Sequence, residues 1–325
     1  MFRTFWKFVG VAVMALAVSA PVSHAKQRLL MGTSTGGGSY YVLGGTWSNA
    51  LNGKLGDKAD LSIEVTGGPE TNIMLIENKE MDLGMVTAWQ AGDMYNGKGK
   101  VPQKFQAMRS FIPLYPSYLQ IYALADSGLK TIHDIDGKHV ASSSAGSRSF
   151  LAARAIIDTL GLKPAKVSGM PASQQLNTLR DGQTQASFSV MGVPAPVIME
   201  MEASNEINLL TMTQDDFDKL LKAYPYWTQG VIPKGTYKAA KEDIQVISLW
   251  NFAVAHKDLP EDLVYEMTKT TFEVLPQLAN AVKDMAKTKP SDILYSSVPL
   301  HKGAIRYYRE VGLAIPDKLI PAEAK

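Results

Sequence analysis

Apolar residues in the first third of the chain recur with the periods of both helices and strands. Leu43, Trp47 and Leu51 stand four residues apart, which predicts one buried face of a helix. Short apolar runs around it predict strands at Arg28–Met31, Leu61–Val65 and Asp82–Thr87, and a second helix is predicted over Asn72–Asn78. This order of elements is a βαβαβ unit, which is typical of an α/β fold with a parallel sheet.

The same alternation starts again after Pro113 and Pro116. Leu119–Ala125 predicts an extended connector between the two halves. Leu151, Ala155, Ile156 and Leu160 predict a helix, and Gly161 ends it because glycine readily adopts the left-handed conformation of a helix C-terminus. The other predicted elements are strands at Val140–Ser142, Ala186–Val190, Ile207–Leu210 and Leu249–Ala255, a turn-rich segment at Tyr224–Gly235, and a helix over Glu261–Leu275.

Two α/β halves predict two lobes, because about 300 residues are too many for one simple core. The loops at the carboxyl ends of the strands should face a ligand cleft between the lobes. We expect residues 26–118 together with about 256–325 to form lobe 1, and residues from about 119 to 255 to form lobe 2.

The first 25 residues have the pattern of an export signal. Arg3 and Lys7 form a basic start, Phe8–Val18 is apolar, and Ser23-His24-Ala25 provides a small-x-small cleavage site. The apolar run is too short to span a bilayer, which needs about 20 residues. We expect cleavage after about Ala25 and a periplasmic mature protein; an uncleaved anchor is the alternative.

Composition excludes several classes of partner and chemistry. The 325 residues include 33 basic and 31 acidic side chains, interspersed to a net charge of +2, which gives no footprint for nucleic acid and no basic cluster for direct lipid anchoring. There is no cysteine, and His133, His139, His256 and His301 show no metal-ligand spacing. No nucleophile–base or acid–base pair stands out, so we expect neither an enzyme nor a cofactor.

Four loops of small and polar residues fall between a predicted strand and a helix. They are Gly36–Gly38 with Ser39, Tyr40 and Tyr41 after it, Gly67–Asn72, Thr87–Gln90, and Ser142–Ser149. Serine and threonine at such positions are commonly N-caps, and glycines are commonly plain turns. Their recurrence at equivalent strand ends instead favours a cleft of backbone N–H groups and hydroxyls that binds an anion.

These loops, in this order, resemble the TAXI family of TRAP-transporter solute receptors. The resemblance covers essentially the whole mature chain and runs through Met31–Thr33, Gly37–Tyr41, Gly67-Gly68 with Asn72, Asp82-Leu83, Tyr95–Gly97, Leu114–Pro116, Gly137-Lys138 with Val140, Gly146-Ser147, Gly192 with Pro194, Pro299–Ala304 and Arg306–Glu310. It implies a type II-like periplasmic binding protein that closes on its ligand and delivers it to TRAP membrane subunits. Ligands in that family include glutamate, 2-oxoglutarate and related carboxylates.

The resemblance and the loops together give a set of candidate ligand-binding residues: Ser39, Tyr40, Tyr41, Asn72, Trp89, Gln90, Gly146, Ser147, Arg148, Ser149 and Gly192. His301 is expected to be structural. The sequence departs from the family at Arg148-Ser149, where Gly-Thr is usual, and at Ala88-Trp89, where Ser-Asp is common. An arginine can hold a carboxylate in bidentate fashion, although it can also point to solvent. We therefore expect a dicarboxylate or keto-acid more than an amino acid.

Two other functions fit the same sequence. A sensory receptor would bind the ligand in the same cleft and pass the signal to a membrane sensor kinase. A periplasmic enzyme on this fold is the more remote alternative.

Overall fold

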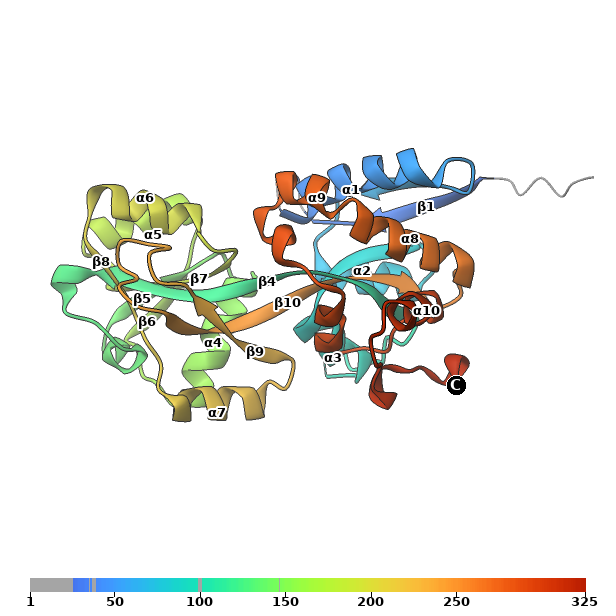
Figure 1. The fold of residues 1–325 in the computed structure, drawn as a ribbon. Coiled ribbons are helices and arrows are strands. Elements are labelled where there is room, and N and C mark those ends of the chain that lie inside the picture. Colours follow the sequence, from blue (N-terminus) through green and yellow to red (C-terminus); the bar gives the residue numbers. More distant parts are fainter. Residues whose placement is uncertain (1–25, 35, 37–38, 99–100, 146) are drawn as a thin grey trace, which may run out of the picture.

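The computed structural model describes residues 26–325 except 35, 37, 38, 99, 100 and 146. The predicted signal segment at residues 1–25 lies outside this range. Figure 1 shows two lobes joined by two long strands, with β4 (Met108–Leu124) and β10 (Ile244–His256) running from one lobe into the other. The described strands form one sheet of order β2-β1-β3-β10-β4-β7-β5-β6, in which β8 also pairs with β4 and β9 with β10. The chain is therefore a mixed α/β protein with two lobes, as predicted.

Lobe 1 contains the predicted βαβαβ unit. Its elements are β1 (Gln27–Gly32), α1 (Ser39–Leu55), β2 (Ala59–Glu64), α2 (Pro69–Glu77), β3 (Leu83–Thr87) and α3 (Ala88–Tyr95). Strands β1, β2 and β3 are parallel. Leu43, Trp47 and Leu51 are fully buried, which confirms the helical face predicted from their spacing. The C-terminal helices α8 (Glu261–Glu273), α9 (Leu275–Ala281) and α10 (Lys302–Glu310) return to this lobe.

Lobe 2 repeats the pattern around a second parallel set of strands. This set consists of β5 (His139–Ser142), β6 (Lys166–Gly169) and β7 (Ala186–Met191). The lobe also contains β8 (Ile207–Leu209), antiparallel to β4, and β9 (Trp227–Ile232), antiparallel to β10. Its helices are α4 (Arg148–Leu160), α5 (Ala172–Arg180), α6 (Pro196–Ser204) and α7 (Gln214–Ala223). Gly161 has φ 68° at the end of α4, as its predicted role requires.

The long strands correct two predictions. Leu119–Ala125 was predicted as a connector, but nearly all of it is the second half of β4, paired with β7 and β8. The sheet is also not purely parallel, because β10 is antiparallel to β3, β4 and β9. Strand β9 falls inside Tyr224–Gly235, where turn-forming residues hid it. Apolar periodicity identifies a strand but does not give the direction of its neighbour.

The hydrophobic cores divide the chain between the lobes. Phe252–Ala255 pack into the core of lobe 1, whereas Trp227, Ile247 and Leu249 pack into a core of lobe 2. We therefore propose that the chain crosses back from lobe 2 to lobe 1 between Leu249 and Phe252, a few residues before the boundary expected near 255.

Within the described residues, no helix has the length and apolarity needed to cross a membrane.

Candidate ligand-binding site

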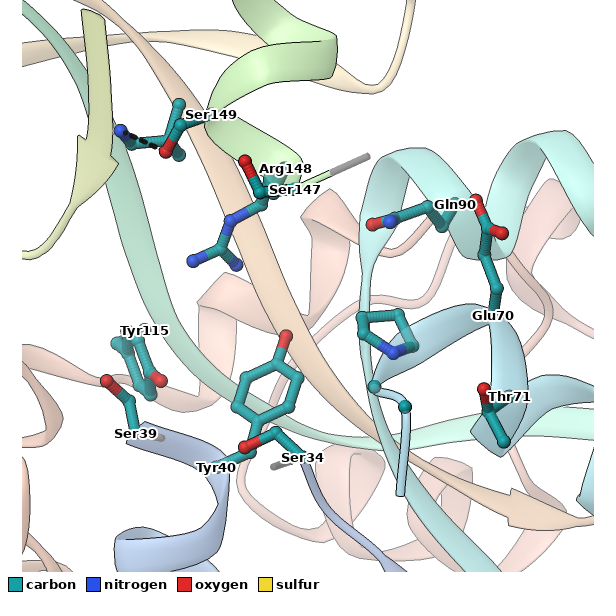
Figure 2. Close-up of a pocket in the computed structure, with 14 residues that line it drawn as sticks. Ser34, Ser39, Tyr40, Glu70, Thr71, Gln90, Tyr115, Ser147, Arg148 and Ser149 are labelled. Atoms are coloured by element: carbon teal, nitrogen blue, oxygen red, sulfur yellow. Dashed lines mark hydrogen bonds between the residues drawn. The ribbon is translucent and has the colours of Figure 1, made fainter. Parts of the chain in front are cut away.

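A cavity of about 410 Å³ opens between the lobes. Its lining is mostly polar and consists of Ser34, Ser39, Tyr40, Gly67, Gly68, Pro69, Glu70, Thr71, Gln90, Tyr115, Ser147, Arg148, Ser149 and Val190. Figure 2 shows the Arg148 guanidinium and the Tyr40 hydroxyl turned toward each other, with Gln90 and Glu70 on the opposite side. The described part of the chain contains no cluster of His, Asp and Glu side chains suited to hold a metal ion.

The beginnings of four helices meet at this cavity. Ser39 and Tyr40 begin α1, Pro69–Thr71 begin α2, Gln90 lies in the first turn of α3, and Arg148-Ser149 begin α4. Each of these helices follows a strand of the sheet, so their N-termini gather at the carboxyl ends of those strands. Helix N-termini carry unpaired N–H groups and partial positive charge, so their convergence favours a negatively charged ligand.

Arg148 is the cation in the described lining. Its Nη1 donates to the side-chain oxygen of Asn251 at 2.8 Å, and its Nε is buried without a hydrogen-bond partner. Among the described residues, Arg148 forms no ion pair. A partly buried guanidinium without a carboxylate partner is costly unless a ligand supplies the negative charge.

Two tyrosines beside Arg148 provide neutral hydroxyls. The Tyr40 hydroxyl donates to the same Asn251 oxygen at 2.5 Å. Burial raises the pKa of Tyr40, although the nearby Arg148 charge opposes the rise. Burial likewise raises the pKa of Tyr115 to about 12. Both side chains are therefore protonated at neutral pH, and the cavity gains hydrogen-bonding groups without gaining negative charge.

Serine side chains fix the start of α4 at the cavity wall. Ser147 is the N-cap and accepts a hydrogen bond from the Phe150 amide at 3.2 Å. Ser149 is buried and accepts from the Val190 amide at 3.0 Å, which ties α4 to β7. Ser147 thus has the N-cap role that is common for a serine at a helix start. Ser147 and Ser149 also line the cavity.

Six of the predicted ligand-binding residues line the cavity: Ser39, Tyr40, Gln90, Ser147, Arg148 and Ser149. Gly146 and most of the predicted glycine loop, Gly37 and Gly38, lie outside the described residues. Tyr41 is exposed at the surface of α1 and is not part of the cavity lining. Gly192 is also outside the lining: it lies beside Asp284, and its carbonyl accepts a hydrogen bond from the Gln120 side chain.

Asn72 is fully buried within lobe 1 rather than in the cavity lining. Its side-chain oxygen accepts from Thr66 Oγ1 at 2.7 Å, and its amide donates to the carbonyls of Gly32, Thr33 and Met85 at 2.8–3.1 Å. These bonds tie α2 to the end of β1 and to the middle of β3. The structure therefore gives Asn72 a supporting position behind the cavity.

Trp89 also lies outside this lining and packs against lobe 2. Its ring meets Trp227 and Tyr224 edge-on, with centroid distances of 5.3 and 5.6 Å. It borders a smaller cavity of about 160 Å³ that shares Glu70 and Gln90 with the larger one. Trp89 is thus a contact between the lobes.

Sequence reasoning missed Tyr115 and Asn251. Tyr115 stood in a motif of the family resemblance, and its position between two prolines was a signal that the strand is irregular there. Asn251 lies inside an apolar run, where a single polar residue is a signal of a buried hydrogen-bonding role. The lining residues Gly67–Thr71 belong to a loop that the sequence predicts to face the cleft. Asn72 was the one residue of this loop that we predicted to bind the ligand.

The sequence assigns the chain to a known protein family. Residues 31–312 match the model of the NMT1-like family, and the chain therefore belongs to that family. A TctC solute-binding protein from Polaromonas, solved without ligand, has a TM-score of 0.57 at 15% identity, covering 89% of this chain and 99% of that one.

Two further solved structures have a similar fold. XAC2383 from Xanthomonas citri, bound to ATP, has a TM-score of 0.54 at 9% identity over 89% of this chain and 100% of that one. The periplasmic binding protein BugD has a TM-score of 0.50 at 14% identity over 88% and 96%. At these identities the likeness concerns the fold, which is that of the two-lobed periplasmic solute-binding proteins.

Proposed function

We propose that this protein is a periplasmic solute receptor that captures a small carboxylate by closure of its lobes and delivers it to a membrane transporter. The observation that carries the proposal is Arg148, a partly buried guanidinium without an ion-pair partner among the described residues, placed where four helix N-termini meet. Both features favour the same ligand charge, and both face the same cavity.

The other lining groups support a ligand rich in hydrogen-bonding oxygens. Tyr40, Tyr115 and Ser39 lie near Arg148, and Thr71 and Gln90 lie across the cavity. Val190 and Pro69 are the aliphatic side chains in the described lining. A dicarboxylate or keto-acid fits this lining better than a long aliphatic acid, since each polar wall group needs a partner once water leaves.

The transport route is proposed from the family resemblance. The order of motifs from Met31 to Glu310 favours a TRAP-type system, in which the receptor passes its ligand to membrane subunits that use an ion gradient. Contacts from Arg148 in lobe 2 and from Ser39 or Thr71 in lobe 1 to one ligand would favour the closed state.

A ligand screen tests the proposal. Native mass spectrometry of protein purified from its own host, followed by a thermal-shift screen, should identify one or more carboxylates of three to six carbons. Sugars, divalent metal ions and organic cations serve as matched sets of non-anionic compounds. Stabilisation by a sugar or a cation, with none by carboxylates, would refute the proposal.

A further inference from the structure

We propose that Asn251 is a positioning residue for the binding site, which fixes Arg148 so that its guanidinium faces a ligand carboxylate. The inference rests on the proposed function, because it concerns how the same cavity holds its anion. Asn251 is fully buried in β10 and is not part of the cavity lining. It acts through Arg148 and not by touching the ligand.

The carboxamide of Asn251 uses all of its hydrogen-bonding capacity. Its oxygen accepts from Arg148 Nη1 at 2.8 Å and from the Tyr40 hydroxyl at 2.5 Å. Its amide donates to the Tyr115 carbonyl at 2.7 Å and to Ser117 Oγ at 3.0 Å. Because the Asn251 amide makes two hydrogen bonds as donor and the oxygen accepts two, the side chain is held in one orientation.

An irregularity in the sheet explains why Asn251 is available for this role. Trp250 pairs with Pro116 and Phe252 pairs with Pro113, so two residues of β4 lie opposite Asn251 alone. This is a β-bulge, which breaks the ladder and re-aims side chains, and proline favours it because it lacks a backbone donor. The Tyr115 carbonyl takes its hydrogen bond from the Asn251 side chain, while the Tyr115 side chain lines the cavity.

The bond to Asn251 determines which part of Arg148 stays available. Nη1 is occupied, and Nε is buried without a partner. Nη2 has no hydrogen bond among the described residues and is not buried, so it is the guanidinium nitrogen left to donate to a carboxylate in the cavity. A buried donor without a partner is costly, and a ligand carboxylate that reached Nε as the lobes closed would remove that cost. The site is therefore arranged in advance for its ligand.

Asn251 also links the lobes at this point. Arg148 belongs to α4 of lobe 2, Tyr40 belongs to α1 of lobe 1, and both donate to one oxygen on the crossing strand. The orientation of the arginine is consequently fixed only when lobe 2 is next to lobe 1. Asn251 thus connects closure of the lobes with the presentation of the guanidinium.

A measurement without ligand tests the positioning directly. The ¹⁵N NMR signal of the Arg148 side chain, assigned with Arg148→Lys, should report slow rotation of the guanidinium in the wild-type protein. Asn251→Ala should make this rotation fast. Asn208→Ala is the control, because it removes a carboxamide that donates to the Leu129 carbonyl at 2.9 Å, outside this cavity. Equal rotation in the wild type and Asn251→Ala would overturn the inference.

A second variant keeps the shape of the side chain and changes its charge. Asn251→Asp should pair with Arg148 and weaken binding of 2-oxoglutarate, used as the carboxylate probe, by about 10- to 100-fold at pH 7.5. The titratable groups around this position are Arg148, Tyr40 and Tyr115, with Asp284 near Tyr115. Because the neighbouring Arg148 charge holds the pKa of an introduced Asp carboxyl at or below its ordinary value of about 3.9, the ratio of variant to wild-type Kd should stay the same from pH 7.5 to pH 5.

The outcomes separate this inference from the proposed function. A Kd for Asn251→Asp equal to the wild-type Kd at pH 7.5 would contradict the positioning role, because the introduced carboxylate would then not compete with the ligand for Arg148. If the wild-type protein does not bind 2-oxoglutarate, that result counts against the choice of ligand, and the NMR measurement alone then decides on Asn251. If Asn251→Ala fails to fold, Asn251→Asp provides the test.

Discussion

Trp89 of α3 meets Trp227 of β9 edge-on, with ring centroids 5.3 Å apart and planes at 86°. Ala88, Ala91 and Met94 of the same helix belong to the core of lobe 1, whereas Trp227 belongs to a core of lobe 2. The pair is therefore a contact between lobes, directly beside Gln90 of the cavity wall. Such a contact exists only while the lobes are together, so it contributes to the balance between open and closed forms.

Trp89→Ala should shift the ligand-free protein toward an open form. The change removes two edge-on aromatic contacts, to Trp227 and Tyr224, each worth about 0.5–1.5 kcal/mol. Small-angle X-ray scattering should show a larger radius of gyration without ligand, and ligand affinity should fall by about tenfold because closure costs more. Phe272→Leu, which alters a stack with Tyr307 inside lobe 1, should change neither quantity. An unchanged scattering curve for Trp89→Ala would contradict this account.

Gly92→Ala should have a similar effect through a steric route. A Cβ at this position would lie 2.3 Å from a ring carbon of Tyr226, so the Tyr226 ring, with or without the segment before β9 that carries it, must move away from α3. The hydrogen bond of 2.9 Å from Asn96 to the Tyr226 hydroxyl should then be lost. Gly45→Ala is the matched change, because the nearest atom to its Cβ lies at 3.8 Å. If both variants scatter like the wild type, α3 and this segment do not restrain the lobes.

Asn72→Ala should destabilise lobe 1 without a direct effect on ligand contacts. It leaves the buried carbonyls of Gly32, Thr33 and Met85 short of a donor, and each unsatisfied buried group costs about 1–3 kcal/mol. We expect the free energy of unfolding in urea to fall by about 2–4 kcal/mol. Asn78→Ala, at the exposed end of the same helix, should change it by less than about 0.5 kcal/mol. Equal losses in the two variants would refute the supporting role.

His301 should make lobe 1 less stable as the pH falls. Burial lowers the pKa of His301 to about 4, so the folded state holds it neutral while the unfolded chain takes up a proton near pH 6.5. Stability is therefore lost between pH 6.5 and 4, by about 2–3 kcal/mol at pH 4.5 relative to pH 7.5. His301→Asn removes the titration and keeps an acceptor for the Gly303 amide, so urea unfolding should show a smaller loss. An identical pH dependence in both proteins would show that His301 does not contribute.

The alternation of strands and helices was predictable because it depends on local apolar patterns. Leu43, Trp47 and Leu51 show their helical face in sequence alone, and Gly161 marks the end of its helix. The long strands were not predictable in the same way. Pro113 and Pro116 interrupt the apolar pattern of β4 at the bulge. The sequence therefore predicts a break at the prolines and a separate connector after them, where the structure has one continuous strand. The antiparallel pairing of β10 depends on tertiary contacts that local periodicity does not encode.

The site was predictable where it depends on the starts of helices. Ser39, Gln90, Ser147 and Arg148 follow strands, and strand ends meet at one edge of a sheet. Asn72 follows a strand as well, but a polar residue at a helix start has the same signature whether it faces a cavity or the core. Asn251 lies in mid-strand, and its importance arises from a bulge formed by a distant segment.

The central claim is that Arg148 binds a carboxylate of the ligand, and a double-mutant cycle by calorimetry tests it most directly. The wild type and Arg148→Ala are each titrated with the best carboxylate from the screen and with its amide, in which the charge is removed. Arg154→Ala is the control, since Arg154 lies on the same helix but is exposed and pairs with Asp158. We expect the wild type to prefer the carboxylate by about 10- to 100-fold, a preference that is lost in Arg148→Ala and kept in Arg154→Ala. The same preference in Arg148→Ala as in the wild type would contradict the account.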